Sequence, residues 1–429
     1  MSANNVDVYP CGQSSLEQKW SKQDTTWMLG MFGTAIGAGT LFLPINAGMH
    51  GIWPLLVFVV LALPMTYFSH RALCRFVLSG SDEKGDITHV VDDFFGHIAG
   101  QFLTFLYFFS IYPIVLMYSV AITNTVQSFV INQMGMTPLP RGMTSIILLI
   151  ALMSVIRLGQ QSIIKAMSLL VYPFIAVLML LAVYLIPHWN GAIFTQVSVE
   201  GQSSGEFIKA LWLGIPVIVF SFNHSPIISA FAVSQKKQHG QAADKPANRI
   251  LKYSHCLMVV TVLFFVFSCV FSLSPSDLAQ AKAQNLSILS YLANHFSQPF
   301  ISYVAPLVAF IAIAKSFLGH YIGASEGMHG LILKGLRMGK LHYSRFQIYL
   351  VIDSFMVLSC WLVATLNPSI LGMIESLAGP IVAALLFIMP MYAIYTVPAM
   401  AKYKNKVSDT FIIVIGLVAI SATVFSLIF

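Results

Sequence analysis

Two short segments interrupt otherwise apolar helical stretches, and they constrain this chain more than any other feature. The first, GTAIGAG, covers residues 33–39 in the first apolar stretch, and the second, SFNHSP, covers residues 221–226 in the sixth. Glycines in the first segment and Pro226 in the second disfavour regular helical hydrogen bonding. Non-helical backbone at membrane depth is tolerated only where protein buries it or where it lines a cavity. A pair of such breaks in two halves of a chain is typical of transporters with inverted repeats.

The composition places the chain in a lipid bilayer. Hydrophobic residues make up 57% of the 429 residues, charged residues make up 9%, and the mean hydropathy is +0.79. A soluble core could not bury so much apolar surface. The formal net charge is +7, but the basic residues lie in short loops between apolar stretches. A nucleic-acid partner is therefore not expected.

No sequence motif in a fitting context indicates an enzyme or a metal centre. Five cysteines occur without a CxxC spacing, so neither a disulfide framework nor a zinc site is indicated. No HExxH motif occurs, and the two GxSxG matches, at residues 201–205 and 323–327, do not follow a strand as the nucleophile motif of hydrolases does, so an intramembrane hydrolase is not indicated. We therefore expect no enzymatic activity, no metal and no cofactor. A channel is the alternative from another class, although no ring of like charges or filter loop points to one.

Eleven apolar stretches are long enough to cross a hydrocarbon core. Their expected boundaries are 26–48, 52–78, 99–131, 143–158, 163–187, 207–233, 251–273, 300–324, 347–366, 370–397 and 409–428. The fold class is therefore an all-α polytopic membrane protein. We expect a cytoplasmic tail over 1–24, a transporter core over 25–400, and a loop with the eleventh helix over 401–429.

The two breaks also predict an internal repeat. Positions 37 and 223 lie 186 residues apart, and each break opens a group of five spans. This spacing is what a five-plus-five inverted repeat requires, with broken helices 1 and 6. The repeats are expected to cover about 26–187 and 207–397.

The distribution of lysine and arginine predicts the orientation. With a cytoplasmic N-terminus, nineteen of the 23 basic residues fall on the cytoplasmic side. Only Arg141, Lys209 and Lys282 fall on the opposite side, and Lys315 lies inside a span. This asymmetry follows the positive-inside rule. With eleven spans, it places the C-terminus in the periplasm.

The glycine-rich break allows two interpretations. Gly33 and Gly37 form a GxxxG pair, which favours close packing between membrane helices. Alternatively, a helix broken at residues 34–39 directs freed N–H groups toward a carboxylate and freed carbonyl groups toward an ammonium. A zwitterionic amino acid carries both groups and is the expected class of substrate.

The second break is more specific, because Asn223 and His224 place two polar side chains at mid-membrane. A membrane histidine often serves only as a hydrogen-bonding group between packed helices. Here Ser221, Ser225 and Pro226 favour an unwound segment that faces the substrate. Alternatively, His224 carries a coupled proton, because imidazole titrates near neutral pH in water.

Lys315 is the anomaly of the eighth apolar stretch. An isolated lysine near the bilayer centre costs about 3 kcal/mol on insertion scales. Snorkelling is the alternative explanation, but at ~1.5 Å per residue neither interface is close. A desolvated lysine can exchange its proton when a neighbouring site changes, so we predict a role in proton coupling. Glu326 and Glu375 are further candidate proton carriers, and Tyr112 is a candidate to face the substrate.

Six runs of the sequence resemble the hydroxy and aromatic amino acid permease family. They are WMLGMFGTAIGAGTLFLPINAG (27–48), IYPIVLMYSVAITNT (111–125), VFSFNHSPIISAFAV (219–233), SILSYLANHF (287–296), AKSFLGHYIGASEG (314–327) and LNPSILGMIESLAGP (366–380). They occur in the same order and with similar spacing over nearly the whole chain from Trp20 onward. On these motifs the chain is similar to the serine-transporting members of the family.

The resemblance implies a bacterial inner-membrane protein with the LeuT-like fold, which imports L-serine with protons and uses no cofactor. It implies substrate-binding residues at the two breaks, to which we add Tyr112: Thr34, Ala35, Ile36, Gly37, Ala38, Gly39, Ser221, Phe222, Asn223 and His224. Lys315 and Ser316 are expected where sodium-coupled relatives bind an ion, and the other proton-coupling candidates are Glu326, Glu375 and His224. Threonine or an aromatic amino acid is the alternative substrate.

Overall fold

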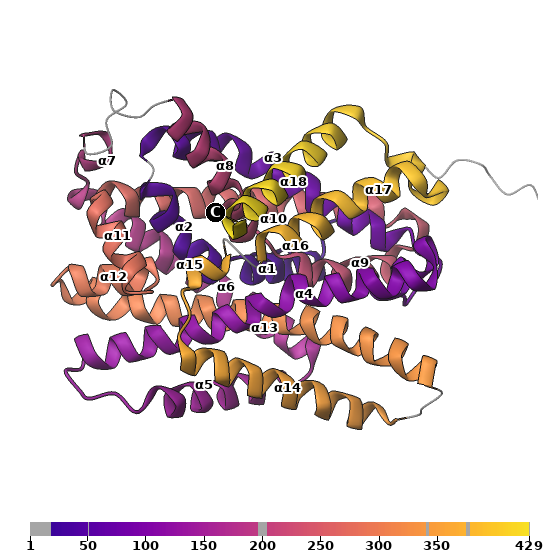
Figure 1. Cartoon of the computed structure of the whole chain (residues 1–429), viewed down its shortest axis with the longest axis horizontal. Helices are drawn as coiled ribbons and strands as arrows, with labels where there is room; N and C mark the ends of the chain where they lie inside the picture. The colour runs from indigo at the N-terminus through magenta and orange to yellow at the C-terminus, as the bar shows by residue number, and fades with distance from the viewer. Residues whose placement is uncertain (1–18, 50, 196–203, 340–342, 375–377, 429) are drawn as a thin grey trace, which may run out of the picture.

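The computed structural model describes residues 19–49, 51–195, 204–339, 343–374 and 378–428, and every regular element in these ranges is helical (Figure 1). Up to the second break the elements are α1 (Lys22–Ala35), α2 (Ala38–Met49), α3 (Ile52–Leu78), α4 (Ile87–Asn132), α5 (Arg141–Ile156), α6 (Gln160–Tyr184), η1 (Ile186–His188), α7 (Ala192–Thr195) and α8 (Ser204–Ser221). After it they are α9 (Ser225–His239), η2 (Gly240–Ala242), α10 (Asp244–Ser272), α11 (Pro275–Ala283), α12 (Ile288–His295), α13 (Pro299–Gly339), α14 (Arg345–Leu366), α15 (Ile370–Met373), α16 (Gly379–Ala383), η4 (Ala384–Ile388), α17 (Met389–Thr396), η5 (Pro398–Tyr403) and α18 (Lys406–Ile428). The prediction of an all-helical chain is confirmed.

Polar side chains at the helix starts satisfy amide groups that a helix cannot bond internally. At α1, the Ser21 hydroxyl accepts from the Asp24 amide at 3.1 Å, and the Asp24 carboxylate accepts from the Ser21 amide at 2.9 Å. Ser274 and Ser344 form equivalent capping boxes at α11 and α14, and Asp86 caps α4. These caps fix where the loops end and the apolar helices begin.

Several helices have the length and apolar character that a membrane span requires. Six pass on their own: Ile52–Leu78, Ile87–Asn132, Leu169–His188, Asp244–Ser272, Pro299–Leu336 and Arg345–Leu366. Two pairs pass together but bend at a short break, by 52° between α1 and α2 and by 45° between α8 and α9. α4 and α13 extend furthest beyond their predicted bounds, since α4 begins at Ile87 and α13 continues to Gly339.

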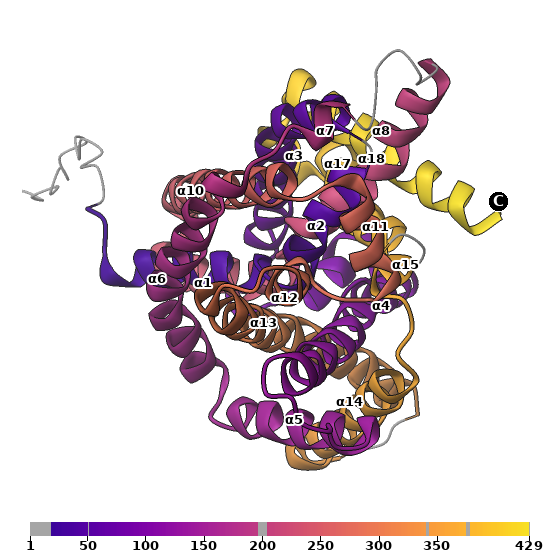
Figure 2. The ribbon, with the colours of Figure 1, turned by 90° about the vertical axis from the view of Figure 1, so that its left-hand side faces the viewer.

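α4 and α13 pack side by side near the centre of the molecule (Figure 1). α5 and α14 cover one side of this pair, whereas α3, α8 and α18 lie on the other (Figure 2). α1 packs between α6, α10 and α13. The first break is therefore enclosed by protein, and Thr34 and Ile36 beside it are fully buried.

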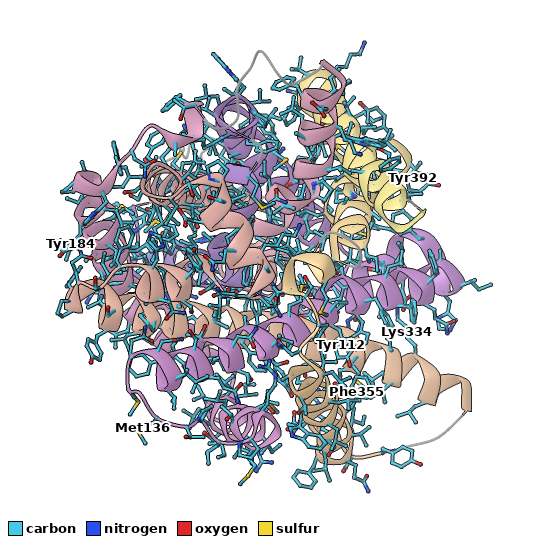
Figure 3. The ribbon with its side chains drawn as sticks, turned by 60° about the vertical axis from the view of Figure 1, so that its left-hand side comes forward. Tyr112, Met136, Tyr184, Lys334, Phe355 and Tyr392 are labelled. Atoms are coloured by element: carbon cyan, nitrogen blue, oxygen red, sulfur yellow. The ribbon has the colours of Figure 1, made fainter. Side chains whose placement is uncertain are left out.

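A buried lysine ties the added length of α4 to that of α13. Gly96 interrupts the helical geometry of α4 with a φ of 78° and a ψ of 172°, which glycine adopts at low cost. On either side of this kink, the Lys334 ammonium (Figure 3) donates to Asp92 Oδ1 at 2.9 Å and to Thr104 Oγ1 at 2.7 Å. It also donates to the Gly100 carbonyl at 3.0 Å. Lys334 thus holds the kink against α13.

We predict that Lys334→Met lowers the free energy of unfolding by about 1–3 kcal/mol, because charge-assisted hydrogen bonds are lost. Asp92 is partly exposed, so water recovers part of the loss. The melting temperature of the purified protein in detergent measures the effect. Lys245→Met, at an exposed position of α10, is the matched control and should leave the melting temperature unchanged. Equal melting temperatures for Lys334→Met and the wild type would contradict the clamp.

Candidate functional site

The two breaks lie in direct contact. Residues 36–37 separate α1 from α2, and residues 222–224 separate α8 from α9. The Thr40 hydroxyl donates to the Ser221 carbonyl at 3.0 Å, and the Ser221 hydroxyl donates to the Gly39 carbonyl at 2.9 Å. The Ser221 carbonyl lies at the C-terminal end of α8, where carbonyl groups lack helical partners, so the Thr40 hydroxyl replaces a bond that the break removes. Segments far apart in the sequence thus form one site.

α13 closes against the first break. The Ser316 hydroxyl donates to the Thr34 carbonyl at 2.6 Å and is hydrogen bonded to the Tyr118 hydroxyl at 2.7 Å. A Cβ atom on Gly37 would lie 2.3 Å from Ser316 Cβ, so only glycine permits this approach. At Gly39 an added Cβ would lie 2.8 Å from the Phe220 ring. Both glycines therefore allow close packing around the break.

The second break carries two buried side chains with unpartnered polar atoms. Asn223 Oδ1 accepts from the Ser225 amide at 3.1 Å, and His224 Nδ1 lies 2.9 Å from the Phe222 carbonyl oxygen. Among the described residues, neither Asn223 Nδ2 nor His224 Nε2 has a hydrogen-bond partner. Buried polar atoms without partners are rare in folded proteins. These two atoms are therefore candidates for contact with a ligand.

Lys315 is buried in α13, directly before Ser316. Its side chain points toward α6, where Nζ lies 3.7 Å from the centroid of the Phe174 ring. Nζ has no hydrogen-bond partner within the part of the chain that the structure describes. The aromatic face attracts the ammonium but cannot accept its three N–H bonds as oxygen would. The lysine therefore retains an unmet requirement for an acceptor.

A cavity of about 1030 Å³ opens along α1, α9 and α13, and the residues that line it include none from the two breaks. It is bounded by α1, α9, α13, α14 and the segments before α4 and α6, and its lining includes Lys22, Trp27, Lys84, Asp86, Arg157, Lys165, Val233, Lys237, Tyr321, Ser325, Glu326, Tyr349 and Asp353. Its basic residues all belong to loops and helix ends that the charge distribution assigns to the cytoplasm. The cavity therefore lies at the predicted cytoplasmic end.

Three acidic residues line this cavity: Asp86, Glu326 and Asp353. Glu326 accepts a hydrogen bond from the Tyr107 hydroxyl at 3.4 Å. Burial disfavours ionisation of Asp86, but hydrogen bonds from His89 and Thr88 prevail and hold the pKa of its carboxyl below its ordinary value. Asp86 is thus a fixed negative charge at the start of α4, whereas Glu326 lies on α13.

The structure places the remaining predicted residues as follows. The Ala35 carbonyl accepts from the Thr40 hydroxyl at 3.3 Å, and Phe222 is buried. The Tyr112 ring packs against Phe355 of α14 at a centroid distance of 5.3 Å (Figure 3), so it belongs to the contact between α4 and α14. Glu375 and the side chain of Ala38 lie outside the described residues.

Sequence reasoning overlooked several side chains of the site. Tyr118, rather than Tyr112, is the tyrosine of α4 that contacts Ser316. His320 packs on the Tyr118 ring with its Nδ1 2.9 Å from the Ser316 carbonyl oxygen. The four-residue spacing from Ser316 to His320 was the available signal, because such residues share one face of a helix. His70 and His255, which lie beside His224, gave no such signal.

Comparisons with known proteins agree with this architecture. A sequence profile described as the tryptophan/tyrosine permease family matches residues 26–429. The serine transporter SdaC of Escherichia coli (strain K12) is 57% identical over 410 residues, which cover 95% of this chain and 96% of that protein. The serine transporter SdaC of Shigella flexneri is 56% identical over 410 residues, with the same coverage. The sequence relatives are therefore transporters and not enzymes.

Solved structures share the fold at low sequence identity. MhsT in complex with L-phenylalanine aligns with a TM-score of 0.64 and 14% identity, covering 96% of this chain and 99% of that chain. A mutant of the Eremococcus coleocola manganese transporter aligns with a TM-score of 0.62 and 14% identity, covering 94% and 85%. The chain thus resembles transporters of the LeuT fold and is a membrane-embedded, multi-pass protein.

We expect Gly37→Ala to lower the free energy of unfolding by about 1–3 kcal/mol, the usual cost of overpacking. The new Cβ would strike Ser316 Cβ and Oγ, at 2.3 and 2.4 Å. Thermal unfolding in detergent measures the loss, and Gly335→Ala, with nothing within 4 Å of its added Cβ, is the control. In a Ser316→Gly background the obstructing atoms are gone, so Gly37→Ala should cost less. An equal cost in both backgrounds would show that this contact does not limit the position.

Proposed function

Because the chain belongs to the tryptophan/tyrosine permease family, we propose that it imports L-serine with protons across the bacterial inner membrane by alternating access. The 57% identity to a serine transporter supports the choice of substrate. One structural observation carries the proposal: Asn223 Nδ2 and His224 Nε2 are buried, and neither has a partner among the described residues, at a break that touches the other break. A small polar ligand would give these atoms partners.

The proposed membrane arrangement has eleven spans in two inverted repeats. In chain order the spans are α1 with α2, α3, α4, α5, α6, α8 with α9, α10, α13, α14, the group from α15 to α17, and α18. The first five form the repeat near 26–187 and the next five the repeat near 207–397. Residues 1–24 form a cytoplasmic tail, 25–400 the transporter core, and 401–429 a loop with a last helix that ends in the periplasm.

The substrate would lie between the breaks, with Thr34, Ile36, Gly37 and Gly39 supplying backbone on one side. The first N–H groups of α2 lack helical partners and suit the serine carboxylate, while carbonyl groups at the end of α1 suit its ammonium. Asn223 offers a donor and, while its Nε2 holds no proton, His224 offers an acceptor, and a hydroxyl can pair with both. This arrangement accounts for each polar group of L-serine.

The cavity supports an inward-facing state. It lies at the end of the molecule that is rich in basic side chains. At the opposite end α11 packs on α2, where a Cβ on Gly48 would lie 2.4 Å from Leu278 Cδ1. The substrate would leave toward the cytoplasm from this state. Separation of α2 from α11 would open the outer path.

Coupling to protons is assigned first to Lys315. Its unpartnered ammonium adjoins Ser316, which holds the end of α1 through the Thr34 carbonyl. A change of charge at Lys315 can therefore act on the contact between α13 and the first break. Glu326, Glu375 and His224 are the other candidates, and no cofactor is needed.

A first prediction concerns selectivity. Buried groups left unpaired cost about 1–3 kcal/mol each, so the wild type should prefer serine to alanine by at least about tenfold. In Asn223→Ala, the serine-to-alanine uptake ratio should fall by a larger factor than the rate of alanine uptake. Competition against radiolabelled L-serine uptake in proteoliposomes measures both, and threonine, tyrosine and tryptophan in the same panel test the alternative substrates.

The matched control is Asn124→Ala. It also removes a buried side-chain amide, one on α4 that donates to the Asn285 carbonyl at 2.8 Å. Its serine-to-alanine ratio should equal that of the wild type. An unchanged ratio in Asn223→Ala would exclude Asn223 from the specificity site. A serine uptake rate that does not saturate as the serine concentration rises would favour a channel.

A second prediction concerns coupling. Lys315→Met keeps the side-chain length but removes the titratable group, so proton-driven serine accumulation should fall toward the equilibrium level while serine exchange across the membrane persists. Lys252→Met, an exposed lysine of α10, serves as control and should accumulate serine normally. If Lys315→Met accumulates serine like the wild type at equal protein level, Lys315 has no coupling role.

A further inference from the structure

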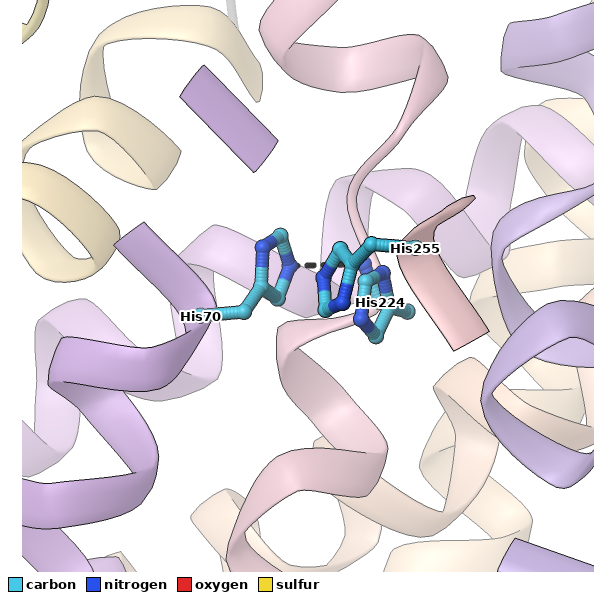
Figure 4. A group of neighbouring side chains, drawn as sticks. All are labelled: His70, His224 and His255. Atoms are coloured by element: carbon cyan, nitrogen blue, oxygen red, sulfur yellow. Dashed lines mark hydrogen bonds between the residues drawn. The ribbon is translucent and has the colours of Figure 1, made fainter. Parts of the chain in front are cut away.

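Three buried histidines from separate segments meet at the second break (Figure 4). His70 lies on α3, His224 directly precedes α9, and His255 lies on α10. One ring nitrogen of each lies within 4.8 Å of a ring nitrogen of the others. The His70 and His224 rings are stacked with centroids 3.8 Å apart, and the His224 and His255 centroids are 4.8 Å apart.

Backbone carbonyl groups engage one nitrogen of each ring. Nδ1 lies 2.8 Å from the Thr66 carbonyl oxygen in His70, 2.9 Å from that of Phe222 in His224 and 2.5 Å from that of Leu251 in His255. A carbonyl only accepts, so each Nδ1 must carry a hydrogen. In the neutral imidazole the other nitrogen, Nε2, is then an acceptor. The cluster therefore presents three Nε2 lone pairs.

These acceptors lack enough donors. His70 Nε2 accepts from the His224 backbone amide at 3.2 Å. His224 Nε2 and His255 Nε2 have no partner among the described residues. A single added proton on either nitrogen would create an N–H donor for the other, so it would satisfy both atoms. A second proton would place two positive charges on adjacent rings, which repel.

We propose that this cluster holds the coupled proton, shared between Nε2 of His224 and Nε2 of His255. The proposal rests on the proposed function and moves the primary proton site from Lys315 to the second break. An N–H···N bond needs nitrogens about 3 Å apart, so proton uptake would draw α10 and the break together. Asn223 directly precedes His224, and proton binding would thereby set the position of the serine-contacting amide.

The surroundings suit one buried positive charge. The titratable groups that face the cluster are His320 of α13 and Tyr67 of α3. The carboxylates nearest in sequence on adjoining helices lie in ion pairs, Asp244 with Arg75 at 2.8 Å and Asp24 with Arg249 at 3.7 Å. These two carboxylates are thus already paired with arginines and do not keep the cluster permanently charged, so the proton can leave.

The ring geometry disfavours a three-histidine metal centre. A metal ion lies close to the plane of each imidazole that binds it, but the His70 and His224 planes are parallel to within 1° and stacked. One ion cannot lie in both planes unless a ring turns. His70 Nε2 is also occupied by the backbone amide. A proton needs only the two unpartnered nitrogens.

His255→Gln tests the proposal, because glutamine keeps hydrogen-bonding groups but does not titrate. Purified variants in proteoliposomes would be assayed for serine exchange without a gradient and for serine-induced proton movement with a pH-sensitive dye. We expect His255→Gln to keep exchange within a few-fold of the wild type and to lose proton movement at least tenfold. His97→Gln, at an exposed position of α4, should retain both.

The outcomes separate the cluster from the proposed function. A wild type that exchanges no serine would refute the serine assignment itself. If His255→Gln moves as many protons per serine as the wild type, the histidine cluster is not the proton site. If EDTA abolishes proton movement by the wild type, the cluster binds a metal and the proposal is also overturned. If His255→Gln does not fold, solid-state NMR of ¹⁵N-histidine in the wild type decides: a nitrogen–nitrogen coupling between two Nε2 atoms at low pH is expected, and its absence would overturn the proposal.

Discussion

Backbone groups released at two helix breaks must find hydrogen-bond partners where no bulk water reaches, and the centre of the molecule is arranged around that requirement. Thr40 and Ser221 each bond a carbonyl of the opposite break, and Ser316 of α13 bonds the carbonyl of Thr34. The three hydroxyls hold α1, α2, α8 and α13 together. Gly37 and Gly39 permit the short approaches that these bonds need. A site with backbone directed at a small ligand follows from the same constraint.

The backbone carbonyl groups at the breaks have hydrogen-bond partners, whereas several polar side chains nearby do not. Asn223 Nδ2, His224 Nε2 and Lys315 Nζ are buried without partners among the described residues. An unpaired buried amide, imidazole and ammonium each cost free energy that a partner would recover. Under the proposed function, serine and a proton would supply such partners. Binding and proton coupling would then be two uses of one polar centre.

Features fixed by local chemistry could be predicted from the sequence, and features fixed by helix rotation could not. Glycine, proline and the length of apolar runs act locally, so the breaks and the long helices were foreseeable. Lys315 was identified because a charge in an apolar run is rare. The choice between Tyr112 and Tyr118 depends on which face α4 turns toward α13, and only tertiary packing sets that. His70 and His255 contact His224 across large sequence separations, and single apolar-face histidines carry no sign of a cluster.

Amide hydrogen exchange followed by mass spectrometry, with and without L-serine, tests the central claim that both breaks form one serine site. The account predicts slower exchange on adding serine in two separate segments, residues 34–40 and 221–225, with alanine protecting the second segment less. The peptides of α14, which packs away from the breaks, should not respond. Protection confined to one break, or serine binding without protection at either, would contradict the account.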